Sequence, residues 1–188
     1  MKDRNIMTTG HVFIATSLDG FIARKDHTLD WLPQEKIEGE DSGYEAFISS
    51  VDGLIMGRGT FEKILTFGDW PYPKPVIVLS KTLTQDAIPD ELEGKVRVSQ
   101  LSPREIMKSL AEEGWKRVYI DGGQIVQSFF KKRLIEDMVI TLIPILIGEG
   151  IRLFGKTDGD VNLKLVASQA FPLSGMVQNH YKVLYSKQ

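Results

Sequence analysis

Short β-rich runs alternate with helical patterns along most of this chain, and this alternation constrains its fold more than any other feature. Enrichment in β-branched and aliphatic residues predicts strands at 11–17, 54–56, 75–79, 95–98, 117–120, 137–143, 161–169 and 176–185. Helical patterns fall between them at 44–50, 60–65, 103–113 and 124–131. The sequence therefore predicts an α/β fold, in which helices cover a mixed sheet and the last two strands form an antiparallel hairpin at one edge.

The best-defined helix start is at Ser102, which precedes Pro103 and stands three residues before Glu105. This is the pattern of a capping box with proline at the first helical position. The stretch 23–43, by contrast, has no regular pattern and is long for a connection within a compact domain. We expect that stretch to be a functional or mobile loop.

Size and composition favour one enzyme-sized domain. The chain has 188 residues, of which 42% are hydrophobic, and this is enough for one full core. We expect the domain to span residues 11–186, after a flexible segment at 1–10. A net charge of -2 and a pI near 6.0 give no field that would attract nucleic acid or anionic lipid, so we expect neither partner.

Cysteine is absent from the sequence, which excludes disulfides, thiolate metal ligands and cysteine nucleophiles. The three histidines, His11, His27 and His180, have no ligand spacing between them, so we expect no metal site. The sequence also lacks the apolar run of about 20 residues that a membrane span needs, and its start lacks the apolar centre of a signal peptide. We therefore expect a soluble, cytoplasmic protein.

A glycine pair between a strand and a helix gives the first functional signal. Gly122 and Gly123 follow the strand at 117–120 and precede the helix at 124–131. Glycines there let the backbone approach an anion closely, and the start of the helix supplies unpaired N–H groups and a positive dipole end. A lone Gly-Gly pair is more often a plain tight connection. A diphosphate cofactor is nevertheless the leading interpretation.

Two other strand ends carry groups that suit a phosphate. The segment 57–60, Gly-Arg-Gly-Thr, contains Arg58, which can fork onto a phosphate or stack on a planar base. Ser80 and Lys81 follow another strand and suit a 2′-phosphate on a ribose. Ligands of open sheets with crossover helices collect at the carboxyl ends of the strands. We therefore expect the three turns to meet at one site.

Several motifs occur in a recognisable order. They are Ala-Thr-Ser-Leu-Asp-Gly-Phe-Ile-Ala at 15–23, Ile-Met-Gly-Arg-Gly-Thr-Phe at 55–61, Leu-Ser-Lys at 79–81, Asp-Gly-Gly-Gln at 121–124, and Pro-x-x-x-Gly-x-Gly at 144–150. Their order and approximate spacing resemble those of dihydrofolate reductases, and match still better the related reductase domain of riboflavin biosynthesis. The resemblance covers nearly the whole chain. It implies a three-layer dihydrofolate reductase-like fold with a mostly parallel central sheet.

The resemblance implies NADPH as the cofactor. It places Ala15 and Ile22 beside the nicotinamide and Ser80 and Lys81 at the 2′-phosphate. Cations near the ribose favour the extra phosphate of NADPH over NADH. The full set of implied cofactor contacts is Ala15, Ile22, Gly57, Arg58, Thr60, Leu79, Ser80, Lys81, Asp121, Gly122, Gly123, Gln124 and Ile125.

Folate reductases of this fold use one buried acid to bind the pterin ring and assist its protonation, helped by a threonine. Thr141 stands where that threonine belongs. Asp41 and Glu35 compete for the acid, because Asp41 lies at the right ungapped distance before Gly57 whereas Glu35 follows a Trp and a Pro as the family acid does. Asp19 belongs to the Ser-Leu-Asp-Gly signature, and we expect it to order the loop near the substrate. Aromatic candidates for the walls of a substrate pocket are Trp31, Tyr44, Phe47, Phe67 and Trp70.

We therefore expect an NADPH-dependent oxidoreductase that transfers hydride to a pterin- or pyrimidine-type small molecule. Its nearest relative by motif is 5-amino-6-(5-phosphoribosylamino)uracil reductase of riboflavin biosynthesis. Dihydrofolate reductase is the alternative activity, and a non-catalytic nucleotide- or pterin-binding module is the alternative of another class. The dense apolar character of the chain after Thr141 also suits a homodimer face.

Overall fold

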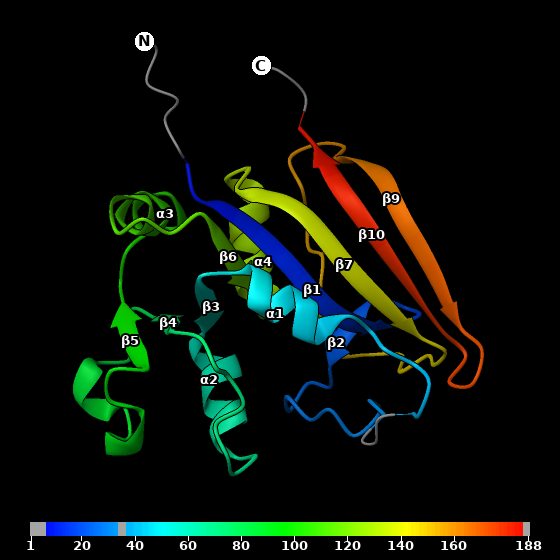
Figure 1. Ribbon diagram of the computed structural model, residues 1–188, viewed down its shortest axis with the longest axis horizontal. Helices are drawn as coiled ribbons and strands as arrows, with labels where there is room; N and C mark the ends of the chain where they lie inside the picture. The colour runs from blue at the N-terminus through cyan, green and yellow to red at the C-terminus, as the bar shows by residue number, and fades with distance from the viewer. Residues whose placement is uncertain (1–6, 34–36, 186–188) are drawn as a thin grey trace.

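The computed structural model describes residues 7–33 and 37–185, which form a twisted eight-stranded sheet with helices on both faces (Figure 1). In spatial order the strands are β5 (Val96–Ser99), β4 (Val76–Leu79), β3 (Gly53–Gly57), β6 (Arg117–Ile120), β1 (Thr9–Ser17), β7 (Ile135–Ile143), β10 (Met176–Leu184) and β9 (Asn162–Phe171). Neighbouring strands are parallel from β5 to β7, whereas β10 is antiparallel to both β7 and β9.

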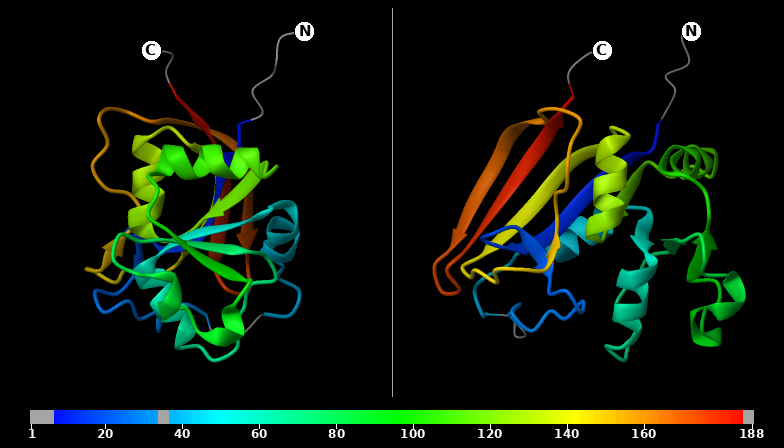
Figure 2. Two further views of the ribbon diagram at one scale, coloured as in Figure 1. Left: turned by 90° about the vertical axis from the view of Figure 1, so that its left-hand side faces the viewer. Right: turned by 180° about the vertical axis from the view of Figure 1, so that it is seen from behind.

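The helices cover two faces of this sheet. They are α1 (Tyr44–Ser50), α2 (Arg58–Leu65), α3 (Pro103–Glu112) and α4 (Gly123–Lys131), with short 3-10 turns at Gln85–Ala87 and Asp90–Leu92. Helices α3 and α4 lie on one face and α1 on the other (Figure 2). A separate two-stranded sheet pairs β2 (Phe21–Ala23) with β8 (Ile151–Arg152) in antiparallel fashion. None of the helices in the described ranges has both the length and the apolar character that crossing a bilayer requires.

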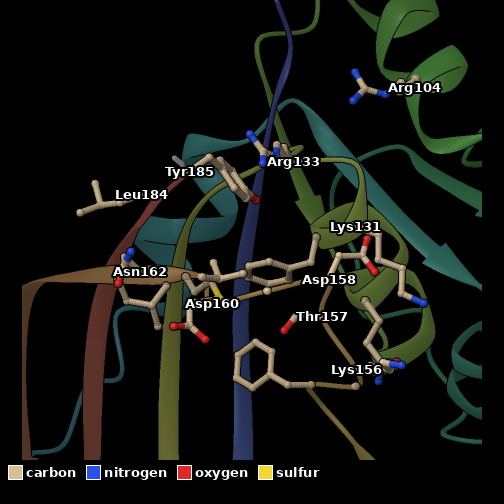
Figure 3. A pocket seen from close by; sticks show the side chains of 18 residues that line it. Arg104, Lys131, Arg133, Lys156, Thr157, Asp158, Asp160, Asn162, Leu184 and Tyr185 are labelled. Carbon is tan, nitrogen blue, oxygen red and sulfur yellow. The ribbon is translucent and has the colours of Figure 1, made fainter. Parts of the chain in front are cut away.

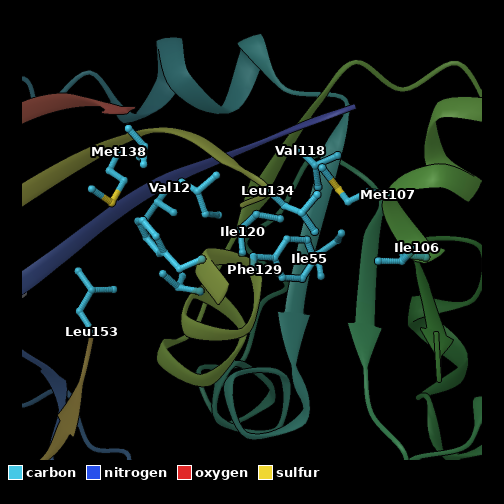
Figure 4. Packing of buried hydrophobic residues seen from close by; sticks show 14 of the residues in the cluster. Val12, Ile55, Ile106, Met107, Val118, Ile120, Phe129, Leu134, Met138 and Leu153 are labelled. Atoms are coloured by element: carbon cyan, nitrogen blue, oxygen red, sulfur yellow. The ribbon is translucent and has the colours of Figure 1, made fainter. Parts of the chain in front are cut away.

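Alternation along the inner strands sorts their side chains into two hydrophobic cores. In β3, for example, Ile55 enters the core beneath α3 and α4, whereas Leu54 and Met56 enter the core beneath α1 and α2. Figure 4 shows the first of these cores, in which Phe129 of α4 packs beside Ile55 and Ile120. Since both faces of these parallel strands are buried, they need continuous apolar runs, as the sequence has. Burial of the apolar side chains in these two cores, worth about 25 cal/mol per Å² of surface removed from water, is the main stabilising term of the fold.

The predicted α/β architecture is confirmed, including the antiparallel hairpin β9–β10 at the edge of the sheet. Strand β1 begins two residues before the predicted strand at 11–17, because Thr9 and Gly10 already pair with β6. Helix α2 begins at Arg58, so Thr60 lies inside its first turn and does not cap it. Strands β2 and β8 were not predicted, because two or three residues are too few to show a period.

Candidate functional site

A cavity of about 720 Å³ lies at the carboxyl ends of the parallel strands. Ala15 of β1, Gly57 of β3, Leu79 of β4 and the segment that follows β6 form one side of it. The opposite side is formed by β2 and the loop that follows it, including His27. We call it the strand-end cavity. It is the place where a doubly wound sheet usually binds its ligand.

Two helices begin at this cavity without a side-chain cap. Helix α2 starts after Gly57 and helix α4 after Gly122, and neither glycine can cap the amides of its first turn. In α4 the first intrahelical bond runs from the amide of Val126 to the carbonyl of Gly122. The amides of the three preceding residues therefore have no intrahelical acceptor. Both positive helix ends thus point toward one cavity, which is the arrangement that binds anions.

Positions 122 and 123 require glycine, because neighbouring segments leave no room for a side chain. Gly122 has φ +87°, and a Cβ added there would lie 2.5 Å from the Oγ1 atom of Thr60. A Cβ on Gly123 would lie 2.7 Å from the carbonyl oxygen of Arg152 in β8. The turn before α4 therefore packs directly against α2 and against the small β2–β8 sheet. This close packing holds the two helix starts in a fixed relation.

Arg58 brings a guanidinium to the rim of the cavity. Its Nε lies 2.6 Å from Oε1 of Glu62, and its Nη1 donates to the Oγ1 of Thr82 at 3.1 Å. The hydroxyl of Ser80 accepts the amide of Thr82 at 3.2 Å and that of Leu83 at 3.0 Å. Arg58, Ser80 and Thr82 therefore form one polar group at the ends of β3 and β4.

The turn that follows β2 places Lys25 and His27 at the cavity. Arg24 and Asp30 form an ion pair at 2.6 Å, and Asp26 accepts both the amide and the hydroxyl of Thr28. This compact turn holds His27 at φ 64°, with its ring over Gly59. Lys25 and His27 both line the cavity. Sequence reasoning missed them, because an irregular loop shows neither a period nor a motif.

Asp121 is a half-buried acid in the wall of this cavity. Its Oδ1 accepts the amide of Gly122 at 2.8 Å, and it also bonds the hydroxyl of Tyr72. Burial raises the pKa of Asp121 to about 6, although both hydrogen bonds oppose that shift. The same burial raises the pKa of Tyr72 well above its usual value. The carboxyl is therefore charged for only part of the population near pH 6.

A row of residues extends from the cavity across the next two strands. Ala15 of β1 is paired with Thr141 of β7, which is paired in turn with Gln178 of β10. The amide nitrogen of Gln178 donates to the hydroxyl of Thr141 at 3.0 Å and to the carbonyl of Ser42 at 3.1 Å. Gln178 therefore ties the loop before α1 to the centre of the sheet.

Comparisons with known proteins decide the family. The profile of the RibD C-terminal domain matches residues 8–174 of this chain. The chain belongs to the RibD C-terminal domain family. A putative riboflavin biosynthesis protein from Shewanella sp. PV-4 is 41% identical, with a TM-score of 0.87 over 95% of this chain and 100% of that one. YwjB, an uncharacterised protein of Bacillus subtilis, is 35% identical over 90% of this chain and 95% of its own length.

A more distant solved structure supports the fold alone. It is a diaminohydroxyphosphoribosylaminopyrimidine deaminase/5-amino-6-(5-phosphoribosylamino)uracil reductase from Thermotoga maritima, 14% identical, with a TM-score of 0.72. The match covers 94% of this chain and 56% of that one. This chain is therefore a RibD-like reductase domain with the dihydrofolate reductase-like fold, and its family points to an oxidoreductase.

The structure brings the cofactor residues implied by the RibD resemblance together, with one exception. All of them line the strand-end cavity except Lys81, whose side chain is exposed to solvent outside it. The residue beyond it, Thr82, lines the cavity instead, through its bond to Arg58. Lys81 stays a predicted contact, although the cavity lining does not include it. Local sequence did not reveal this, because the turn after β4 sets the direction of each side chain.

Two of the candidate catalytic carboxylates, Asp19 and Asp41, lie outside the lining of this cavity. Asp19 accepts the amides of Ile147 and Gly148, and the Ser17 hydroxyl together with these amides holds the pKa of Asp19 below its usual range. Asp19 therefore ties the Ser-Leu-Asp-Gly turn to the 144–150 element. Asp41 accepts the amide of Gly43 at 2.8 Å and is exposed. Glu35 lies outside the described residues.

Four of the five aromatic candidates for the pocket walls do not line the cavity either, namely Trp31, Tyr44, Phe47 and Trp70. Tyr44 and Phe47 of α1 pack on Phe13 of β1, with ring centroids 5.6 and 4.9 Å apart, so they belong to the second core. Trp31 is buried but contributes nothing to the cavity lining. Phe67, which follows α2, does line the cavity. In residues 7–33 and 37–185, no cluster of three or more His, Asp or Glu side chains could hold a metal ion.

Proposed function

We propose that this protein is an NADPH-dependent reductase that binds its cofactor in the strand-end cavity. One observation carries the proposal: two uncapped helix starts, those of α2 and α4, meet at a single cavity that Arg58 also reaches. Backbone amides at helix starts and a guanidinium are the groups that bind phosphates. Lys25 and Lys63 add positive charge to the same lining. The donor set therefore fits a dinucleotide with several phosphates.

Each part of the cofactor has a set of residues to hold it. The amides at the start of α4 would bind the diphosphate, since they have no other helical acceptor. Arg58, Ser80 and Thr82 would bind the 2′-phosphate, which distinguishes NADPH from NADH. Ala15 and Ile22 would border the nicotinamide, and both already line the cavity.

NADPH would supply the hydride, so the protein has to position the substrate and exclude water rather than supply a nucleophile. The row from Ala15 through Thr141 to Gln178 lies beside the place proposed for the nicotinamide. We propose that a planar pterin or pyrimidine ring binds along this row. Asp41 stays a proposed acid, because Gln178 holds the loop next to it against Thr141.

The direct test is a fluorescence titration with NADPH followed by an oxidation assay. We expect NADPH to bind with a Kd below about 1 mM, in the usual range for cofactors and substrates. We expect steady oxidation of NADPH with 5-amino-6-(5-phosphoribosylamino)uracil as substrate, or with dihydrofolate as the alternative substrate. No binding of NADPH at millimolar concentration would overturn the proposal. Tight binding without oxidation across a pterin and pyrimidine panel would identify a non-catalytic binding module.

We also propose that the protein forms a homodimer. Strand β9 is an edge strand of 10 residues whose first nine are exposed, and they include Leu163, Leu165 and Val166. A long exposed apolar edge is usually covered in solution. Light scattering after gel filtration should give about twice the chain mass of 21.2 kDa. A monomer at micromolar concentration would contradict this proposal and leave the reductase proposal unaffected.

A further inference from the structure

A second cavity, of about 970 Å³, lies at the far end of helix α4. Its lining comes from the end of α4, from residues 154–161 after β8 and from the ends of β9 and β10 (Figure 3). It shares no lining residue with the strand-end cavity. We call it the basic cavity, for its lining residues Arg104, Lys131, Arg133 and Lys156.

The basic side chains of this cavity reach it from separate segments of the chain. Arg104 comes from the start of α3, Lys131 from the end of α4, Arg133 from the turn after α4, and Lys156 from the segment after β8. In Figure 3, Lys131 and Lys156 lie on the same side of the cavity. The acids in the lining are Asp158 and Asp160, so positive charge is in excess. The cavity therefore attracts an anion.

Aromatic rings form the apolar part of the same cavity. Phe130 and Phe154 meet edge to face, with centroids 5.7 Å apart, and Phe154 is 44% exposed. Tyr185 closes the cavity beside Arg133, whose guanidinium carbon lies 6.0 Å from the centre of the tyrosine ring. Flat aromatic and guanidinium surfaces favour a planar ring as a partner.

Two of the basic residues stand at positions where the backbone conformation or the helix dipole disfavours them. Arg133 has φ 58° and is the left-handed residue that ends α4. Its amide donates to the carbonyl of Phe130, and the amide of Leu134 donates to the carbonyl of Phe129. This pattern normally takes glycine, because a side chain strains it. Arg104 lies in the first turn of α3, where the helix dipole disfavours a cation. Lys131, by contrast, suits the end of α4. Both arginines thus stand at positions where local preference is against them, and both line this cavity.

We propose that the basic cavity binds a phosphorylated small molecule with a planar ring, at a site distinct from the strand-end cavity. The phosphate would lie among Arg133, Lys131 and Lys156, and the ring against Phe154 and Tyr185. This proposal does not depend on the reductase activity, because no residue of the strand-end cavity takes part in it.

The test is calorimetric titration of the full chain with adenosine and uridine 5′-monophosphates. At least one should bind, and adenosine, uridine and inorganic phosphate alone should each bind at least about tenfold more weakly, since each lacks one half of the recognition. Arg133→Gly should weaken nucleotide binding at least about tenfold. The melting temperature of the variant protein should stay equal or rise, because glycine relieves the backbone strain. Arg58→Gln, in the other cavity, should leave this binding unchanged.

Three outcomes would overturn the proposal. They are an absence of heat with both nucleotides at millimolar concentration, binding that Arg133→Gly leaves intact, and binding that only Arg58→Gln removes. Lys156→Gln provides a second variant on an exposed segment, where folding is not at stake. This variant should also weaken nucleotide binding. If both variants bind as the wild type does, the site is not the basic cavity.

Discussion

Helix α4 begins at one cavity and ends at the other, and its two ends present different chemistry. At its start, glycines and bare amides face the strand-end cavity. At its end, side-chain cations and aromatic rings face the basic cavity. The first site depends on backbone geometry, so an added Cβ should damage it. The second depends on side chains, so loss of charge should damage it while the backbone tolerates the change.

The start of α3 contrasts with the starts of α2 and α4, because side chains cap it. Ser102 and Glu105 form a complete capping box there, with Pro103 in the first turn. The starts of α2 and α4 have only glycine and no side-chain cap. The start of α3 satisfies amides with its own side chains, whereas the two helix starts at the strand-end cavity leave theirs available.

The largest effect should come from Gly122→Ala. Its new Cβ would clash with Thr60 and would also strain a residue at φ +87°. We expect the free energy of unfolding to fall by about 2–4 kcal/mol, because strain and overpacking add. NADPH affinity, measured by fluorescence titration, should fall at least about a hundredfold, since the start of α4 must shift.

Gly114→Ala is the matched control for that substitution. Gly114 has nearly the same φ, +89°, but no atom lies within 4 Å of an added Cβ. It should lose about 1–2 kcal/mol of stability through strain alone and keep normal NADPH affinity. Adding Thr60→Ala to Gly122→Ala should recover part of the lost stability. If Gly122→Ala and Gly114→Ala behave alike, close packing does not set the geometry of the α4 start.

Asp121→Asn should give the next largest effect, and it depends on pH. The folded protein holds the Asp121 proton up to a pKa of about 6, above the usual 3.8, so the free energy of unfolding falls as the pH rises from about 4 to 6. Each pKa unit corresponds to about 1.4 kcal/mol. Urea unfolding should therefore show that Asn stabilises the protein by up to about 3 kcal/mol at pH 7.5 and by less at pH 4.5. A difference that is constant between these pH values would contradict the burial of this carboxyl.

Arg58→Gln should produce a moderate change confined to the strand-end cavity. It removes the guanidinium and leaves the Glu62 carboxylate unpaired beside the proposed 2′-phosphate. We expect the Kd for NADPH to rise about tenfold and that for NADH to rise less. Lys81→Ala is the control, and it should change either Kd less than Arg58→Gln does because Lys81 does not line the cavity. Equal losses of NADPH and NADH would remove the 2′-phosphate assignment.

Ser102→Ala should produce the smallest effect. Loss of the capping box of α3 should lower the free energy of unfolding by about 1 kcal/mol. Ser109→Ala, further along the same helix, should change stability by less than half as much, as alanine favours a helix interior. Neither variant should alter NADPH or nucleotide binding. A change in NADPH binding with Ser102→Ala would mean that capped and uncapped helix starts do not have separate roles.

Local patterns predicted most of the fold and the three turns that meet at the strand-end cavity. Runs such as Val76–Leu79 encode a buried strand by themselves, and Ser102 and Glu105 encode a helix start within four positions. The substrate side was harder to predict. Asp41 was chosen by its distance before Gly57 along the chain. Tyr44 and Phe47 were chosen as aromatic rings that could stack on a planar substrate, but α1 turns both rings into the second core. Thr82 was missed because its direction depends on a turn that Ser80 closes.

The sequence by itself determined the α/β class, the order of the turns and the family motifs, because these depend on neighbours within a few residues. Only the tertiary structure decided that Gly122 lies against Thr60, that His27 covers Gly59, and that α4 ends in a second, basic cavity. Each of these contacts joins segments far apart in the chain. Their geometry follows from how the helices and the β2–β8 sheet pack on the strands, which no local pattern records.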